Sequence, residues 1–178
     1  MNQSDHSTTR LPDSSIPTTV AVALGTNIGD RRAHLDYAVS RLREFLDELK
    51  VSSYYDTAPV DVAGDQPDFL NAAAVGKTTL AARQVLAALL AIERERGRER
   101  PHPAAARTLD LDLVLFGNDI IDDAPDLTVP HPRFRERAFV LDPLAEIAAD
   151  LRDPVTGKTV GELRRLTASP LPPRGATR

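Results

Sequence analysis

Residues 109–116 read LDLDLVLF and carry the plainest secondary-structure signal in the chain. Leucines occupy the odd positions, and the even positions hold Asp110, Asp112, Val114 and Phe116. Side chains along a β-strand point alternately to opposite faces of the sheet. The pattern therefore predicts a strand whose leucines enter a core and whose aspartates share the other face.

Outward from this strand, the hydrophobic spacing predicts further elements on both sides. Upstream, we expect a strand at 20–24, a helix from Asp30 to Leu49, strands at 51–55 and 72–78 joined by a long loop, and a helix at 80–95. Downstream, we expect a turn at Gly117-Asn118, an antiparallel return strand at 119–122 beside 109–116, and a last helix through Leu166 that begins with a capping box of Thr159 and Glu162. The order strand-helix-strand-strand-helix-strand, with additions, is typical of a ferredoxin-like α+β sheet.

The composition indicates one globular domain. The chain has 178 residues, of which 42% are hydrophobic and 27% charged, as in average soluble proteins. Both ends are polar, so we expect disordered tails at 1–17 and 168–178 around a domain at 18–167. A formal net charge of −4 disfavours nucleic-acid binding through a general basic field, and the lack of cysteine excludes disulfides. Since no apolar run resembles a membrane span or a secretion signal, we expect a cytoplasmic location. We also expect a monomer.

Asp110 and Asp112 are the first candidates for chemistry. Residues two apart in a strand point the same way, with Cα atoms about 6.5 to 7 Å apart, so both carboxylates should face one point. Mg²⁺ prefers oxygen ligands and is commonly shared between one or two carboxylates and substrate phosphates. The alternative is that both aspartates merely line the solvent face of the strand. Because aspartate is disfavoured inside strands, we favour the metal site.

Arginines cluster on both sides of this strand. Upstream, they alternate with glutamates around Gly97, at positions 94, 96, 98 and 100. Arginine forks bind phosphate oxygens, so a basic loop here could cover a triphosphate, but a solvated helix end explains the same residues equally well. Downstream, His131 stands between two prolines and is followed by Arg133, Arg135 and Arg137. A lone histidine is more often structural, yet these neighbours favour an anionic target.

Other phosphate-binding motifs are not found in the sequence. There is no P-loop pattern, and the run GTNIG at 25–29 lacks the third glycine of a dinucleotide fingerprint, so we interpret it as a turn. In the expected long loop, Phe69 and Asn71 stand out. An asparagine amide offers a donor and an acceptor side by side, as the edge of a flat heterocycle requires, and a phenylalanine can stack on its face.

Four blocks of sequence carry a family resemblance: ALGTNIGD at 23–30, QPDFLN at 66–71, RTLDLDL at 107–113, and VPHP at 129–132 followed by RAFVL at 137–141. In this order, over about residues 20–166, they resemble the hydroxymethyldihydropterin pyrophosphokinase family. The resemblance implies a three-layer α/β/α form of the ferredoxin-like fold. It also implies an ATP-dependent diphosphotransferase of folate biosynthesis, which converts hydroxymethyldihydropterin and ATP into the pterin diphosphate and AMP, with two Mg²⁺ ions.

The resemblance further implies roles for individual residues. Asp110 and Asp112 would hold the metal ions and, with Arg98, Arg100 and Arg107, form the catalytic group. The residues that would bind ATP are Glu93, Arg98, Arg100, Arg107, Leu113, Thr128, His131, Arg135 and Arg137. The pterin would be bound by Phe69 and Phe139 on its two faces, and at its edge by Asn71 and the backbone of Thr57, Ala58 and Val60.

Two other functions compete with this one. A different Asp-x-Asp metal-dependent transferase, for instance one that uses a nucleotide sugar, would keep Asp110 and Asp112 but leave Phe69 and Asn71 unexplained. A non-catalytic module that binds RNA through exposed aromatics of a ferredoxin-like sheet is the second alternative. The acidic pI of about 5.6 and the small aromatic content of 4% weigh against it.

Overall fold

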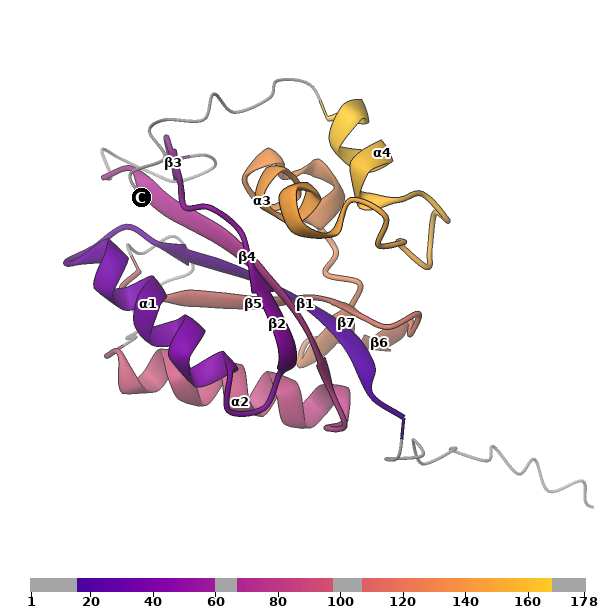
Figure 1. The fold of residues 1–178 in the computed structure, drawn as a ribbon, viewed down its shortest axis with the longest axis horizontal. Coiled ribbons are helices and arrows are strands. Elements are labelled where there is room, and N and C mark those ends of the chain that lie inside the picture. The colour runs from indigo at the N-terminus through magenta and orange to yellow at the C-terminus, as the bar shows by residue number, and fades with distance from the viewer. Residues whose placement is uncertain (1–15, 60–66, 98–106, 168–178) are drawn as a thin grey trace, which may run out of the picture.

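The protein is described by a computed structural model that covers residues 16–59, 67–97 and 107–167. In these residues, five strands form one sheet with helices on both faces (Figure 1). The strands are β1 (Thr18–Thr26), β2 (Asp47–Val51), β3 (Tyr55–Thr57), β4 (Phe69–Thr78) and β5 (Asp110–Phe116). Their order is β2-β4-β1-β5, with β3 paired to the first residues of β4, and every pairing is antiparallel.

The helices form the outer layers. Helices α1 (Arg31–Leu42) and α2 (Ala82–Glu95) cover one face, and α3 (Ala138–Ala148) and α4 (Val160–Leu166) lie on the other (Figure 1). A separate pair of strands, β6 (Ile121–Asp123) and β7 (Leu127–Val129), and a 3₁₀ turn η1 (Phe134–Glu136) connect β5 to α3. The predicted ferredoxin-like α+β fold with three layers is confirmed.

A hydrophobic core fills each side of the sheet. The first core, against α1 and α2, takes the bulky residues of β1, namely Val20, Val22 and Leu24. The second core, against α3 and α4, takes Ala21 from β1 and Ala73 from β4, with Phe134 as its largest buried side chain. Because β1 and β4 present alanines at these two positions, α3 packs close to β4 there.

Helix α1 ends earlier than the sequence pattern predicts. The leucines at 46 and 49 continue the apolar spacing, but the helix stops at Leu42 and residues 47–51 form β2. Leu46 is buried in the first core and Leu49 packs against it. The spacing misleads because the helix, the turn and the strand all contribute apolar residues to the same core.

The alternation of residues 109–116 also breaks near its end. Ala21 pairs with Leu115 and the next residue, Val22, pairs with Leu113, so Val114 is an extra residue in β5. Such a bulge shifts the face to which later residues point. Leu115 therefore lies in the second core and Phe116 in the first, opposite to the prediction.

The predicted hairpin partner of this strand is also wrong. The strand that follows Gly117-Asn118 is Ile121–Asp123, and it pairs with β7 rather than with β5. The outer edge of β5 is used by other groups instead. The His131 N–H donates to the carbonyl oxygen of Val114 at 2.9 Å, and the Leu111 N–H donates to the side chain of Glu93.

Two further expectations concern local boundaries. Phe69 and Asn71 were expected in a loop, but they begin strand β4, which is longer than predicted. The capping box before α4 is confirmed: the Thr159 N–H donates to Glu162 Oε2 at 2.7 Å, and the Glu162 N–H donates to Thr159 Oγ1 at 3.2 Å. Within the described residues, no helix combines the length and apolar character needed to cross a membrane.

Candidate active site

The candidate site is built on two neighbouring rows of residues that cross the sheet. In one row Asn71 of β4 pairs with Gly25 of β1, which pairs with Asp110 of β5. In the next row Ala73 pairs with Ala23, which pairs with Asp112. Paired residues share a face, and strands lie about 4.8 Å apart, so Asn71 and Asp110 stand roughly 10 Å apart on the α3 side. Small residues form the floor between them.

Gly25 keeps this floor open. A Cβ atom at Gly25 would lie 3.1 Å from Oδ1 of Asn71, closer than an ordinary contact. Asn71 itself is buried, and its Nδ2 donates to Oγ1 of Thr57 at 2.7 Å. The hydrogen bond to Thr57 fixes the orientation of the Asn71 carboxamide. Since a carboxamide has two N–H groups and one oxygen, one donor and one acceptor remain to face the row that runs to Asp110.

Asp110 is the first residue of β5, and a residue just before the strand holds its side chain. Its carboxylate forms an ion pair with the guanidinium of Arg107, three residues earlier. The backbone of Arg107 is in turn clamped by buried Asn27: the Arg107 N–H donates to Asn27 Oδ1 at 2.7 Å, and the Asn27 N–H donates to the Arg107 carbonyl at 3.0 Å. The role of Asn27 was missed from the sequence, although it lies in the block ALGTNIGD, because it acts on a residue 80 positions away.

Asp112 faces two groups from the segment that follows β7. Its Oδ2 lies 3.9 Å from Nε2 of His131 and 3.8 Å from Nη1 of Arg137. Burial and the neighbouring carboxylate of Asp110 raise the pKa of Asp112. Two partly buried carboxylates that share one face thus repel each other, and a bound cation would relieve the repulsion.

His131 has a defined tautomer in this arrangement. Burial lowers the pKa of His131, which favours the neutral ring at pH 7. The Arg133 N–H donates to Nδ1 of His131 at 3.2 Å, so the neutral ring carries its proton on Nε2. That N–H faces Asp112 and the space in front of the two carboxylates.

The two phenylalanines both belong to the α3 side of the sheet. Phe139 is half-buried in the first turn of α3, where it packs against the second core, and the guanidinium of Arg137 lies 5.5 Å from the centre of its ring. Phe69 is half-buried at the first residue of β4, opposite Thr57. Ala58 follows β3 directly and is exposed.

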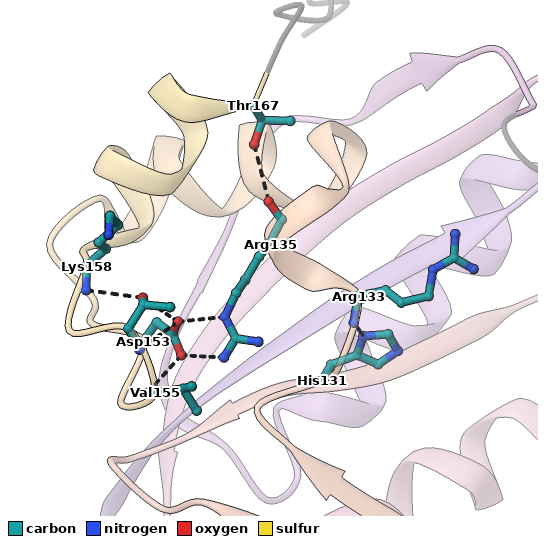
Figure 2. A network of polar contacts seen from close by, with 8 residues as sticks. His131, Arg133, Arg135, Asp153, Val155, Lys158 and Thr167 are labelled. Carbon is teal, nitrogen blue, oxygen red and sulfur yellow. Dashed lines mark hydrogen bonds and ion pairs between the residues drawn. The ribbon is translucent and has the colours of Figure 1, made fainter.

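Arg135 is not brought together with the aspartates. Its Nε and Nη2 each lie 2.7 Å from one carboxylate oxygen of Asp153, which is completely buried. Figure 2 shows the Arg135 side chain extending to Asp153, in the direction opposite to Arg133. The carboxylate also accepts from the Thr156 hydroxyl at 2.6 Å. Without ligand, Arg135 therefore ties the 131–137 segment to the loop before α4, and its expected phosphate contact stays a prediction.

This ion pair yields a testable expectation for stability. Burial alone would raise the pKa of Asp153, but hydrogen bonds from Arg135, Thr156 and the backbone outweigh it and lower the pKa to about 2 from an ordinary value of 3.8. The difference corresponds to about 2 kcal/mol of folding free energy, which is present above pH ~4 and is lost as the pH falls toward 2. Arg135→Gln should lower stability at pH 7 by roughly 2 to 4 kcal/mol, because a buried carboxylate loses its cation.

Urea unfolding at pH 7 measures this loss, with the exposed Arg165→Gln as the charge-matched control. If both variants unfold at the same urea concentration, the Arg135–Asp153 pair does not stabilise the fold.

The other expected ATP-binding residues lie around the strand β5. Leu113 is buried in the first core, so a nucleotide could contact its backbone but not its side chain. Thr128 is half-buried between the buried residues Leu127 and Val129 of β7. Glu93 is buried at the outer edge of β5. Arg98, Arg100 and Val60 lie outside the described residues.

The two carboxylates suit Mg²⁺, which keeps water and substrate as ligands, better than a metal ion whose ligands all come from the protein. Within residues 16–59, 67–97 and 107–167, no group of three or more His, Cys, Asp or Glu residues gathers in a way that could hold a metal ion. Two carboxylates on one face leave most coordination positions to water and substrate. This is the arrangement in which proteins usually hold Mg²⁺ beside phosphates.

Beyond the Asn71 row, the surface is hollowed where loops meet the start of α1. The hollow is lined by Asn27, Ile28, Gly29, Arg31, Pro67 and Asp68. Nη1 of Arg31 donates to Asp56 Oδ1 at 2.8 Å and to the Asp68 carbonyl at 2.9 Å. Arg31 thus fixes the loops at this end of the site.

Comparisons with known proteins identify the family of the chain. The family model described as 7,8-dihydro-6-hydroxymethylpterin-pyrophosphokinase (HPPK) matches residues 21–149. The chain is 44% identical over 137 residues to the 2-amino-4-hydroxy-6-hydroxymethyldihydropteridine pyrophosphokinase of Bacillus subtilis, covering 76% of this chain and 81% of that protein. It is 45% identical over 147 residues to the protein of the same name from Pseudomonas aeruginosa, covering 81% and 88%.

A solved structure shows the same fold. The crystal structure of wild-type Plasmodium falciparum HPPK-DHPS superposes with a TM-score of 0.64 at 13% identity, over 85% of this chain and 45% of that one. The chain thus spans less than half of that longer protein. With the family model covering residues 21–149, and both bacterial relatives sharing more than two fifths of the aligned residues, the chain belongs to the 7,8-dihydro-6-hydroxymethylpterin-pyrophosphokinase family.

Proposed function

We propose that this chain transfers the terminal diphosphate of ATP onto the hydroxymethyl group of 6-hydroxymethyl-7,8-dihydropterin, forming the pterin diphosphate and AMP in folate biosynthesis. One observation carries the proposal beyond family membership. The sheet pairs Asn71 with Gly25 and Gly25 with Asp110, so a side-chain amide and a carboxylate pair share one face. A substrate with a flat ring at one end and a reacting hydroxyl at the other fits this layout.

In the transfer, the hydroxyl oxygen of the pterin bonds to the β-phosphorus of ATP. The bond between that phosphorus and the oxygen bridging to the α-phosphate breaks, AMP leaves with the bridging oxygen, and the hydroxyl proton passes to water. Such reactions need positioning and charge stabilisation rather than a protein nucleophile. Mg²⁺, when bound, supplies charge neutralisation on the phosphates.

The chain's own residues hold the reactants. Asp110 and Asp112 would hold Mg²⁺, as two ions according to the family resemblance. The Nε2–H of neutral His131 and the guanidinium groups of Arg107 and Arg137 would donate to phosphate oxygens.

Residues implied by the resemblance extend this set. Arg98 and Arg100 would add to the phosphate contacts. Phe69 and Phe139 would enclose the ring, while Asn71 and the backbone at Thr57, Ala58 and Val60 would read its edge. A cytoplasmic location and a monomeric state stay predictions.

A coupled assay for AMP tests the proposed function. The protein is incubated with ATP and Mg²⁺, with and without 6-hydroxymethyl-7,8-dihydropterin, and we expect AMP release that depends on the pterin. Two controls address the rival functions: a nucleotide sugar replaces ATP, and single-stranded RNA is titrated at low and high salt. Turnover of the nucleotide sugar without pterin-dependent AMP, or salt-sensitive RNA binding without turnover, would contradict the proposal.

Gly25→Ala should weaken pterin binding without unfolding the protein. The added methyl group would press on Asn71 Oδ1 and shift the amide by a few tenths of an ångström. We expect the KM for the pterin to rise by about tenfold with little change in the KM for ATP, because small displacements of a positioning group are costly.

Gly76→Ala is the matched control, because its Cβ would clash with Leu46 and Asp47 instead. It should lower the melting temperature and leave the pterin KM unchanged. Equal pterin KM values for Gly25→Ala and the wild type would mean that Asn71 does not read the pterin.

A further inference from the structure

Glu93 is a buried carboxylate at the end of helix α2, with 2% of its surface exposed. Its Oε1 accepts a hydrogen bond of 2.7 Å from the N–H of Leu111. Leu111 is the residue between Asp110 and Asp112. Burying a carboxylate is costly unless it is well hydrogen-bonded, and here its bond goes to the strand that carries both candidate metal ligands.

The pairing pattern of β5 shows what this bond does. The inner side of β5 pairs with β1, where Leu111 stands opposite Leu24, between the pairs of Asp110 with Gly25 and Asp112 with Ala23. In an antiparallel pair, successive residues direct their N–H groups alternately toward and away from the partner strand. Since the Leu111 N–H is directed outward to Glu93, the backbones of both aspartates are held by β1 and the residue between them is held by α2.

Helix α2 and the aspartate side chains lie on opposite faces of the sheet. The leucines at 109, 111 and 113 enter the first core against α1 and α2, whereas Asp110 and Asp112 share the α3 side. Glu93 therefore acts on the backbone of the strand and not on the carboxylates themselves. A rotation of the peptide at Leu111 would turn both carboxylates.

We propose that Glu93 is a positioning residue that sets the common direction of Asp110 and Asp112 through the Leu111 amide. The expected effect on kcat rests on the proposed function, whereas the expected effect on the Leu111 amide does not. It differs from a direct contact between Glu93 and the nucleotide, which the family resemblance implies.

Two substitutions separate these roles. Glu93→Asp keeps the charge but withdraws the carboxylate by one methylene, roughly 1.5 Å, so the bond to Leu111 should be lost. Glu93→Gln keeps an acceptor oxygen at the same reach and should retain it. Glu95→Asp is the matched control, because Glu95 lies on the same helix but binds the half-buried side chains of Tyr37 and Arg41 in α1.

The first measurement is amide hydrogen exchange at Leu111 by NMR, on the full chain without ligands. We expect exchange about tenfold faster in Glu93→Asp, and wild-type exchange in Glu93→Gln and Glu95→Asp. The second measurement is steady-state kinetics below the melting temperature. In Glu93→Asp, kcat should fall by about ten- to a hundredfold with less than a threefold change in the KM for ATP or pterin, and Glu93→Gln should restore most of kcat.

Several results would overturn the inference. Wild-type Leu111 exchange in Glu93→Asp would show that the amide does not depend on Glu93. A raised KM for ATP with unchanged kcat would assign Glu93 to nucleotide binding, and a lower melting temperature with unchanged kcat would leave a purely structural role. If the wild type itself forms no AMP with the pterin, the proposed function fails, and the exchange measurement still decides whether Glu93 holds Leu111.

Discussion

Replacing Asp112 by asparagine is expected to reduce pterin-dependent AMP release by about a thousandfold or more. A metal ion between carboxylates and transferring phosphates stabilises the charge of the transition state by several kcal/mol, and each 1.4 kcal/mol corresponds to about tenfold in rate. Asparagine keeps the size of the side chain but lacks the charge that binds Mg²⁺. Asp110→Asn should have an effect of the same order.

The folded state should tolerate both changes. Burial and Asp110 raise the pKa of Asp112, which means that its charge is unfavourable in the unliganded fold, so Asp112→Asn should leave the melting temperature unchanged or raise it. Asp110→Asn loses the ion pair with Arg107 and should lower stability slightly. Thermal unfolding of both variants measures their melting temperatures, with the exposed Asp122→Asn as control.

Near wild-type AMP release in both variants at saturating magnesium would remove the aspartates from the metal site. They would then be polar residues on one side of a strand, which is the alternative that the sequence pattern left open.

Asn71→Ala is expected to weaken pterin binding by about ten- to a hundredfold and to change ATP affinity less than twofold. Asn71 is buried, and its amide is oriented by the bond to Thr57. Removing it leaves a buried edge of the pterin without a partner, which typically costs about 1 to 3 kcal/mol. Calorimetric titration with the pterin and, separately, with a Mg-ATP analogue measures both affinities.

Thr57→Val is the companion variant, since it removes the orienting partner but keeps the amide. It should weaken pterin binding by a smaller factor. Unchanged pterin affinity in Asn71→Ala would exclude this side chain from the binding site, whatever Thr57→Val does.

Much of the fold follows from local pattern, and two of the errors share one cause. The strand at 109–116 and the capping box before α4 depend on neighbours in sequence, and both are present. The predicted end of α1 and the predicted face of Leu115 were wrong, because a turn and a bulge direct apolar residues into the nearer of the two cores. Spacing alone cannot reveal where such an irregularity occurs.

In the candidate site, too, local pattern indicates some residues, whereas contacts between distant parts of the chain could not be predicted. Asp110 and Asp112 could be singled out as candidates from two alternate positions in one strand. Arg135 could not be placed, because its partner Asp153 lies 18 residues later and is recognisable only as one acidic residue among many. The contacts of Asn27 and Glu93 were likewise hidden, since each side chain accepts from a backbone N–H of the β5 region and not from a side chain that a motif would include.

In the proposed reaction a diphosphate moves intact from ATP to the pterin hydroxyl, and phosphorus NMR of the reaction mixture tests this transfer. The wild-type protein is incubated with ATP, Mg²⁺ and 6-hydroxymethyl-7,8-dihydropterin until about half of the ATP is consumed. We expect AMP and a pterin diphosphate in equal amounts, with no ADP. Formation of ADP with a pterin monophosphate, or of AMP with free pyrophosphate and unchanged pterin, would contradict it.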